Sequence, residues 1–143
     1  MAGKVIIGSD HGGFALKEFA IKLLKDMGYE VEDAGPEAAV SCDYPVYAAK
    51  VAEQVSDEKL GILICGTGLG MSMAANKHKG VRAAMCTNEY MAKMARAHNN
   101  ANILCLGERV IGQGLAEEII RAFMTSEFEG DRHLRRINLF DQL

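Results

Sequence analysis

The 143-residue sequence has no Cys-x-x-Cys pair, no long apolar run and no excess of positive charge. Its four cysteines therefore lack the spacing of a zinc site or a disulfide framework, which favours reduced thiols in a cytoplasmic protein. The N-terminal apolar run over 5–7 is too short for a secretion signal or a membrane span. A net charge of −3 gives no general attraction to nucleic acid or to an acidic membrane.

Two phosphate-binding motifs are absent as well. Gly66, Gly68 and Gly70 alternate along the chain, whereas the dinucleotide-binding fingerprint places its third glycine three residues after the second. The phosphate loop of nucleotide hydrolases requires Gly-Lys-Ser/Thr, and no lysine follows these glycines before Lys77. Both nucleotide-binding motifs are therefore excluded for this segment.

Cys65 lies where an apolar strand meets this glycine-rich turn. Residues 61–65 show no polar alternation, as in a strand buried on both faces, and residues 71–77 are predicted to form a short helix. Glycines let the backbone approach a ligand closely, and a helix start directs free N–H groups at an anion and favours a thiolate. The segment predicts a nucleophile or base beside an anion site, although such turns also occur in α/β folds without a function.

Apolar runs and amphipathic helices alternate along the chain. Strands are predicted over 5–8, 29–33, 61–65, 81–86 and 101–106, the second at a sheet edge because its apolar and polar residues alternate. The helix after the fourth strand has Asn88 as its cap and Met91, Met94 and Ala95 on its inner face, and a short last helix covers 129–137. This order predicts a single α/β domain over 1–143, a doubly wound, Rossmann-like, five-stranded parallel sheet with helices on both faces and a C-terminal helix.

In such a sheet, ligands bind beyond the carboxyl ends of the strands. The residues that this rule gathers are Asp10, His11, Tyr44, Arg109 and the segment 65–72. Singly, each has a simpler explanation: Asp10 can cap a helix, His11 can be an exposed loop residue, and Arg109 can pair with Glu108. Their convergence on one edge favours a functional site.

His98 and Asn99 end a helix and therefore belong at the opposite, amino end of the strands. A histidine in that place can simply interact with the C-terminus of its helix. If His98 is catalytic, it has to reach the site of another subunit across a symmetric interface. This topology predicts a homodimer, or a tetramer built from dimers, with His98 and Asn99 reaching the neighbour's site.

Arg132 and Arg136 are one helical turn apart and share a face. On most helices, two arginines at this spacing simply form part of a basic face exposed to solvent. Together with His11 and Arg109, however, the two arginines form a plausible phosphate clamp, because a guanidinium can donate two hydrogen bonds to phosphate oxygens. The acidic composition of the chain disfavours a nucleic-acid patch.

Seven segments, in order along the chain, together resemble the sugar-phosphate isomerase family that includes type B ribose-5-phosphate isomerase and the subunits of galactose-6-phosphate isomerase. The matching segments are 8–13, 43–45, 64–70, 74–77, 97–99, 107–110 and 128–133. The resemblance implies an aldose–ketose isomerase without metal or cofactor that interconverts ribose 5-phosphate and ribulose 5-phosphate through an enediolate.

The same resemblance implies a role for each site residue. Cys65 would be the base that moves a proton between C1 and C2 of the open-chain sugar. Backbone N–H groups at Gly66, Gly68, Gly70 and Ser72 would stabilise the enediolate oxygen. Thr67 would orient a hydroxyl or relay a proton, and His98 with Asp10 would assist ring opening. The remaining ligands are Tyr44 and Asn99 for sugar hydroxyls, and His11, Arg109, Arg132 and Arg136 for the phosphate.

The sequence departs from the family pattern at Asp131, where a glycine is more usual. An acid beside Arg132 can weaken or reorient the phosphate clamp, and His133 is left as a phosphate or interface residue. One branch of the family uses a glutamate shortly before segment 74–77 in place of the cysteine, but residues 71–73 hold no carboxylate here. Cys65 therefore has no substitute as the base.

Other functions stay open. An isomerase of six-carbon aldose 6-phosphates, such as allose or galactose 6-phosphate, needs only a phosphate site farther from Cys65. A non-catalytic module that binds sugar phosphates or nucleotides is compatible with the same fold. A thiol-redox protein is disfavoured, because Cys65 has no resolving cysteine nearby in the sequence.

Overall fold

The computed structural model describes residues 3–143 and contains one parallel sheet with the strand order β2-β1-β3-β5-β4. The strands are β1 (Lys4–Ser9), β2 (Glu30–Asp33), β3 (Lys59–Cys65), β4 (Ala83–Met85) and β5 (Ile103–Gly107). The helices are α1 (Phe14–Asp26), α2 (Tyr44–Ala52), α3 (Leu69–Ala75), α4 (Glu89–Ala97), α5 (Gln113–Thr125) and α6 (Arg132–Phe140), with a 3-10 turn at His11–Gly13. The five-stranded α/β architecture predicted from the sequence is confirmed, including β2 at an edge.

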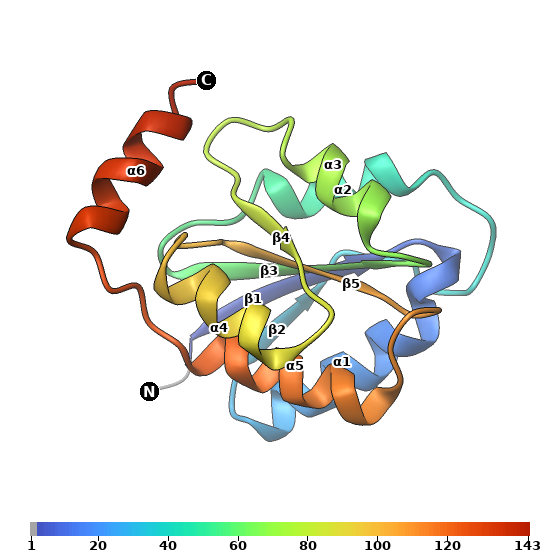
Figure 1. Cartoon of the computed structure of the whole chain (residues 1–143). Coiled ribbons are helices and arrows are strands. Elements are labelled where there is room, and N and C mark those ends of the chain that lie inside the picture. The colour runs from blue at the N-terminus through green and yellow to red at the C-terminus, as the bar shows by residue number, and fades with distance from the viewer. Residues whose placement is uncertain (1–2) are drawn as a thin grey trace.

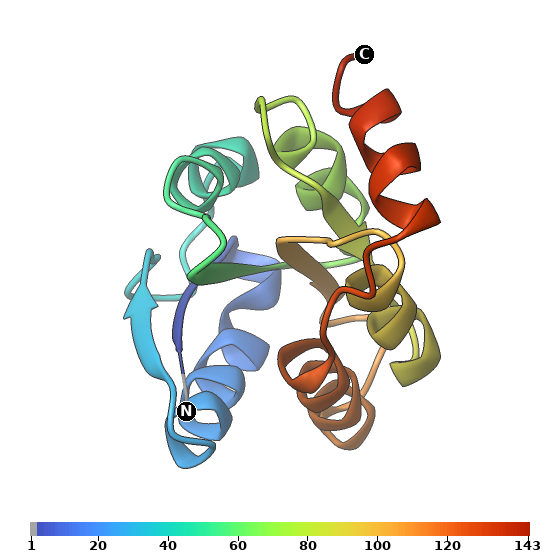
Figure 2. The same cartoon turned by 90° about the vertical axis from the view of Figure 1, so that its left-hand side faces the viewer.

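Side chains alternate across the central strands and build one apolar core on each face of the sheet. On β1, Ile7 packs in the layer with α1, α4 and α5, whereas Ile6 packs in the layer with α2 and α3. Figure 2 shows these two helical layers on either side of the strands. Ile62 and Leu63 of β3 are fully buried on opposite faces, because neither face of a doubly wound sheet meets solvent.

The predicted helix after the fourth strand is α4, and the residues that it buries differ from those predicted. Asn88 does cap α4, since its side chain accepts the N–H of Met91 at 2.9 Å. The placement of Met91 inside was wrong: this side chain is 38% exposed, and the fully buried position is Ala92. Ala92 and Ala95 belong to the core cluster that also holds the inner face of α5, so small side chains let the two helices approach closely.

β4 is shorter than the predicted strand 81–86, and side-chain amides form hydrogen bonds with the backbone at its start. The amide of Asn76 accepts the N–H of Ala83 at 2.8 Å and donates to the carbonyl of Ala83 at 3.0 Å. The Asn102 side chain likewise accepts the N–H of Arg82 at 2.8 Å. These amides satisfy polar backbone groups beside and before an edge strand.

α6 lies at the amino ends of the strands, apart from the two helical layers (Figure 1). Contacts at both of its ends hold it there: the N–H of Glu129 donates to Ala97 at the end of α4, and Arg82 forms an ion pair with Asp141. The helix begins at Arg132 rather than at residue 129, because Gly130 and Asp131 have positive φ angles of 73° and 51°. Left-handed backbone cannot continue a right-handed helix.

The strand order places the site between β1 and β3. After β1 the chain continues to β2 at one edge of the sheet, and after β3 it continues to β4 at the other edge. Where the chain diverges in this way, a crevice opens beyond the carboxyl ends of the two strands. The N–H of Asp10 after β1 donates to the carbonyl of Ile64 on β3, which joins the two loops at this point. Within residues 3–143, no helix combines the length and apolarity required to span a bilayer.

Candidate active site

Cys65 ends β3 with its thiol against the glycine-rich turn. Its Sγ accepts a hydrogen bond from the N–H of Gly68 at 3.1 Å, and only 6% of the residue is exposed. Gly68 has a φ of 83°, a left-handed conformation that glycine adopts without strain. Two residues after Cys65, the exposed Thr67 accepts the N–H of Leu69 on its hydroxyl at 3.2 Å. A backbone donor aimed at sulfur stabilises the negative charge of a thiolate.

Some backbone N–H groups of the glycine-rich turn donate to acceptors within the turn, whereas others have no acceptor. Gly68 donates to Cys65, and Ser72 donates its N–H to the Gly68 carbonyl and its hydroxyl to the Leu69 carbonyl. Within residues 3–143, the N–H groups of Gly66 and Gly70 have no protein acceptor. Of the four predicted donors, Gly66 and Gly70 are thus free to bind a ligand oxygen.

Tyr44 and Arg109 lie on the glycine turn at two different points. A Cβ atom at Gly70 would lie 2.8 Å from the ring of Tyr44, so only glycine leaves room for this side chain. A Cβ atom at Gly66 would lie 3.4 Å from Nη1 of Arg109, whose own N–H donates to the Gly66 carbonyl at 3.0 Å. A phenol and a guanidinium therefore flank the turn that follows Cys65.

Asp10 and His11 occupy the neighbouring loop. The Asp10 carboxylate caps the 3-10 turn by accepting the N–H of Gly13 at 3.1 Å, and His11 is exposed. A Cβ atom at Gly12 would lie 3.4 Å from the backbone nitrogen of Gly66, which places the two loops in contact. The structure thus brings Asp10, His11, Tyr44, Arg109 and the Cys65 turn to one edge of the sheet.

The other four predicted site residues lie at the opposite edge of the sheet, at the amino ends of the strands. His98 and Asn99 follow α4 and precede β5, and Arg132 and Arg136 are on α6 beside them. Figure 1 shows α6 beyond the amino ends of the strands, with the turn after β3 at the far end of the sheet. One copy of the chain does not bring these four residues to Cys65.

His98 stacks on His133, with their ring centroids 4.2 Å apart and their planes 11° from parallel. Oε1 of Glu129 lies 3.7 Å from Nε2 of each ring. Burial lowers the pKa of His133, and the neighbouring His98 and Arg132 lower it further. Within residues 3–143, Nε2 of His133 has no hydrogen-bond partner.

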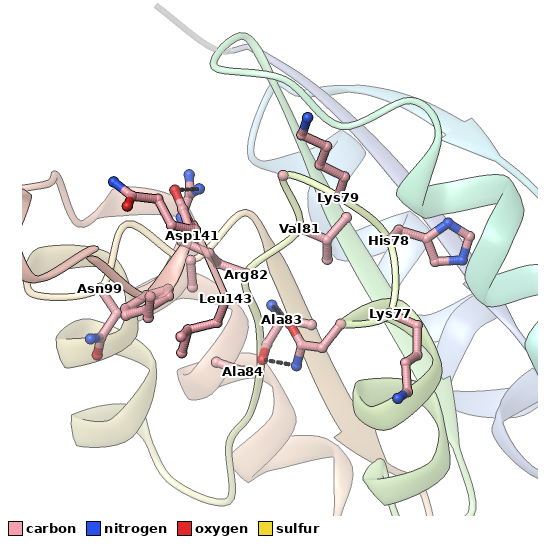
Figure 3. Close-up of a pocket in the computed structure, with 15 residues that line it drawn as sticks. Lys77, His78, Lys79, Val81, Arg82, Ala83, Ala84, Asn99, Asp141 and Leu143 are labelled. Carbon is pink, nitrogen blue, oxygen red and sulfur yellow. Dashed lines mark hydrogen bonds and ion pairs between the residues drawn. The ribbon is translucent and has the colours of Figure 1, made fainter. Parts of the chain in front are cut away.

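A cleft of about 960 Å³ lies at this amino end (Figure 3). It runs between residues 76–84, which lead from the end of α3 into β4, and the C-terminal residues 140–143, and Asn99 lines it. Lys77 and Lys79 give its rim positive charge, whereas Arg82 is paired with Asp141 inside it. This hollow is thus separate from the edge that carries Cys65.

Comparison with known proteins decides the family. The profile of the family described as Ribose/Galactose Isomerase matches residues 5–140. The chain belongs to the ribose/galactose isomerase family. Ribose-5-phosphate isomerase B of Escherichia coli strain K12 is 44% identical over 136 residues, which are 94% of this chain and 91% of that protein.

Solved structures of family members match the whole fold. Ribose-5-phosphate isomerase B from Thermotoga maritima has a TM-score of 0.96 and 48% identity, covering 100% of both chains. The enzyme from Mycoplasma genitalium with bound ribulose 5-phosphate has a TM-score of 0.95 and 44% identity, covering 99% of this chain and 96% of that one. The resemblance predicted from the sequence motifs is confirmed.

Two motif residues of this ribose/galactose isomerase family member have contacts that sequence reasoning did not find. Glu108 does not pair with Arg109; its Oε1 accepts the N–H of Leu16 at 2.7 Å. Asn76 pairs with Ala83 at the edge of β4. Both lie in segments that match the family, so the motifs identify them, but the long-range partners do not follow from spacing.

Proposed function

We propose that this protein interconverts ribose 5-phosphate and ribulose 5-phosphate, with Cys65 as the base. The observation that carries the proposal is the thiol of Cys65 against the N–H of Gly68, at the start of a turn with two open N–H groups, in a member of the ribose/galactose isomerase family. The relative in Escherichia coli is named ribose-5-phosphate isomerase B, and the Mycoplasma genitalium enzyme binds ribulose 5-phosphate.

The proposed isomerisation requires only proton transfers within the sugar and no external oxidant or reductant. The Cys65 thiolate removes the C2 proton of the open-chain aldose, and the C1 oxygen gains negative charge as the enediolate forms. The open N–H groups of Gly66 and Gly70 stabilise this oxygen. Cys65 then returns the proton to C1, while the O2 proton moves to O1 with Thr67 as the relay. The aldehyde carbon is thereby reduced and the neighbouring carbinol carbon oxidised within one molecule.

We further propose that a second copy completes each site. His98 and Asn99 would come from the partner, where His98 acts with Asp10 in ring opening and Asn99 and Tyr44 bind hydroxyls. The placement of His98 and Cys65 at opposite ends of one sheet supports this arrangement, because a symmetric dimer can join two such ends. α6 also exposes three apolar side chains that a partner can cover: Leu134, Leu139 and Phe140.

The phosphate clamp would then be shared between subunits. His11 and Arg109 come from the edge that holds Cys65, and Arg132 and Arg136 come with His98 on the partner. All three arginines are exposed in a single chain, and Nη1 of Arg109 lies against the Gly66 turn. Bidentate phosphate binding by arginines from both copies couples substrate binding to dimer formation. The four free thiols suit the reducing cytoplasm, where we place the enzyme.

The family description also covers galactose isomerases, which makes six-carbon aldose 6-phosphates the second candidate. Turnover of ribose 5-phosphate, allose 6-phosphate and galactose 6-phosphate should be compared with a chelator present. We expect ribose 5-phosphate to have the highest kcat/KM and the chelator to leave it unchanged. A higher value for a six-carbon substrate would move the assignment to that sugar. Phosphate-ester binding without turnover of any of them, unchanged in Cys65→Ala, would indicate a binding module instead.

A further inference from the structure

Glu129 and His133 have no part in the proposed isomerisation, yet they meet His98 in one compact cluster. The three candidate ligand atoms lie within 4.8 Å of one another, and Oε1 of Glu129 is 3.7 Å from each imidazole Nε2. Two imidazoles and one carboxylate form a ligand set that Zn²⁺ adopts in open, three-ligand sites.

We propose that Zn²⁺ binds to His98, Glu129 and His133 and inhibits the enzyme by occupying Nε2 of His98. The binding stands on the cluster alone, whereas the inhibition rests on the proposed function, in which His98 takes part in ring opening. A metal-bound imidazole has no free lone pair at that nitrogen, so it can neither accept nor deliver a proton there.

The two distances between the carboxylate and the imidazoles are close to those around a coordinated ion. Ligand atoms at Zn²⁺ bond lengths lie about 3.4 Å apart in a tetrahedral site. The carboxylate oxygen is already equidistant from both rings, so a contraction of about 0.3 Å brings these two pairs to that spacing. The rings are nearly parallel, and each has to turn about its side-chain bonds for the two lone pairs to converge on one ion.

An unpaired buried nitrogen supplies a second, independent indication. The His133 side chain is 8% exposed, and within residues 3–143 its Nε2 has no hydrogen-bond partner. A buried polar atom without a partner is unfavourable, and a coordinated ion would satisfy it. His98 and Glu129 are 37% and 56% exposed, which leaves an entry path from solvent and a fourth position for water.

Two neighbouring arginines set the strength of the site. Arg132 directly precedes His133 and Arg136 lies one helical turn further along α6, so both repel a cation. Both side chains are exposed, and solvent screens much of this repulsion. The expected site therefore binds Zn²⁺ reversibly and more weakly than a structural zinc site, as suits an inhibitor.

Binding is tested first by calorimetric titration of untagged protein with Zn²⁺. Wild type should bind one ion per chain, and Glu129→Gln should bind it at least about tenfold more weakly, since even a residue outside the ligand shell can be worth that much. Glu127→Gln is the matched control, because it removes an exposed carboxylate of the same segment outside the cluster. His133→Phe keeps a ring stacked on His98 but removes the nitrogen, and it should lose binding too. Equal affinity in wild type and both cluster variants would overturn the proposal.

Co²⁺ in place of Zn²⁺ reports which atoms bind the metal. We expect visible ligand-field bands without the near-ultraviolet charge-transfer band that a thiolate gives. A thiolate band that disappears in Cys65→Ala would place the ion on the cysteine and overturn the proposal.

Inhibition is measured separately with ribose 5-phosphate. Each rate is divided by the same variant's rate without metal, and on this scale Glu129→Gln should require at least about tenfold more Zn²⁺ for half inhibition. A wild type that binds Zn²⁺ at the cluster but never isomerises the sugar would refute the proposed function and leave the metal site standing. An active enzyme whose Zn²⁺ inhibition is the same in Glu129→Gln would refute the inhibitory role.

Discussion

Oε1 of Glu108 accepts the backbone N–H of Leu16 at 2.7 Å, across 92 residues of sequence. Leu16 is in the first turn of α1, and the N-cap residue Gly13 offers no side-chain cap. Glu108 therefore satisfies one of the free N–H groups at this helix start, where a negative charge is favourable. The bond ties the loop that carries Arg109 to the turn that carries His11.

Glu108→Ala should lower the free energy of unfolding by about 1–2 kcal/mol, as expected for the loss of a helix cap. It should also raise KM for ribose 5-phosphate more than it lowers kcat, because Arg109 loses its support while the Cys65 turn keeps its own hydrogen bonds. Denaturant melts and steady-state kinetics measure both effects. Glu108→Gln retains an acceptor oxygen, so its stability and KM should lie between those of wild type and Glu108→Ala. A Glu108→Ala protein with unchanged KM would contradict the positioning role.

Asp131 has a φ of 51° and a ψ of −127°, a backbone region that strains any residue with a Cβ. Relief of that strain is partly offset because glycine gains freedom in the unfolded chain. Asp131→Gly should therefore raise the free energy of unfolding by up to about 1 kcal/mol, measured by denaturant melts. It should also lower KM, because a negative charge beside Arg132 disappears. The backbone account is contradicted if Asp131→Asn, which keeps the Cβ and removes the charge, stabilises the chain as much as glycine does.

Burial raises the pKa of two thiols that lie away from the proposed active site. It raises the pKa of Cys86 to about 11 and raises the pKa of the fully buried Cys105 still further. Brief treatment with iodoacetamide at neutral pH should therefore leave Cys86 and Cys105 unmodified, while Cys65 reacts and substrate protects it. Peptide mass spectrometry gives the site of modification. Alkylation of Cys86 before Cys65 would contradict the assigned environments.

The raised pKa of Cys86 also predicts the alkaline behaviour of the fold. Between pH 9 and about 11, the thiol ionises in the unfolded chain while the folded chain keeps its proton. Ionisation then favours the unfolded state, so the free energy of unfolding should fall as pH rises through this window. Cys86→Ala should show a shallower fall over the same range. Identical slopes for wild type and the variant would refute this contribution.

The proposed sharing of each site between His98 of one subunit and Cys65 of the other can be tested with a mixed dimer. A heterodimer of Cys65→Ala and His98→Ala chains, purified through two different tags, has one site with both residues intact if the sites are shared. It should therefore show about half of wild-type activity, although both homodimers are inactive. If His98 acted within its own chain, both sites of the heterodimer would lack one residue and the mixture would stay inactive.

The fold was predictable from the sequence because its three central strands are buried on both faces and its helices alternate with the strands. The turn after Cys65 was predictable for the same reason, since it follows the most central apolar run. Met91 was misplaced because helical periodicity alone does not distinguish a methionine beside the interface from the alanines that form it. The start of α6 and the Glu108–Leu16 bond depend on local φ angles and on a long-range contact, which residue spacing does not encode.

The proposed role of Cys65 as the base of a sugar-phosphate isomerase is measured through the conversion of ribose 5-phosphate to ribulose 5-phosphate in wild type, Cys65→Ala and the control Cys42→Ala. The assay contains a chelator, and circular dichroism checks the fold of each protein. Loss of a general base typically costs about 10²–10⁴-fold, so Cys65→Ala should lose at least about 10²-fold in kcat while Cys42→Ala keeps wild-type activity. A folded Cys65→Ala protein that isomerises the sugar at the wild-type rate would contradict the account.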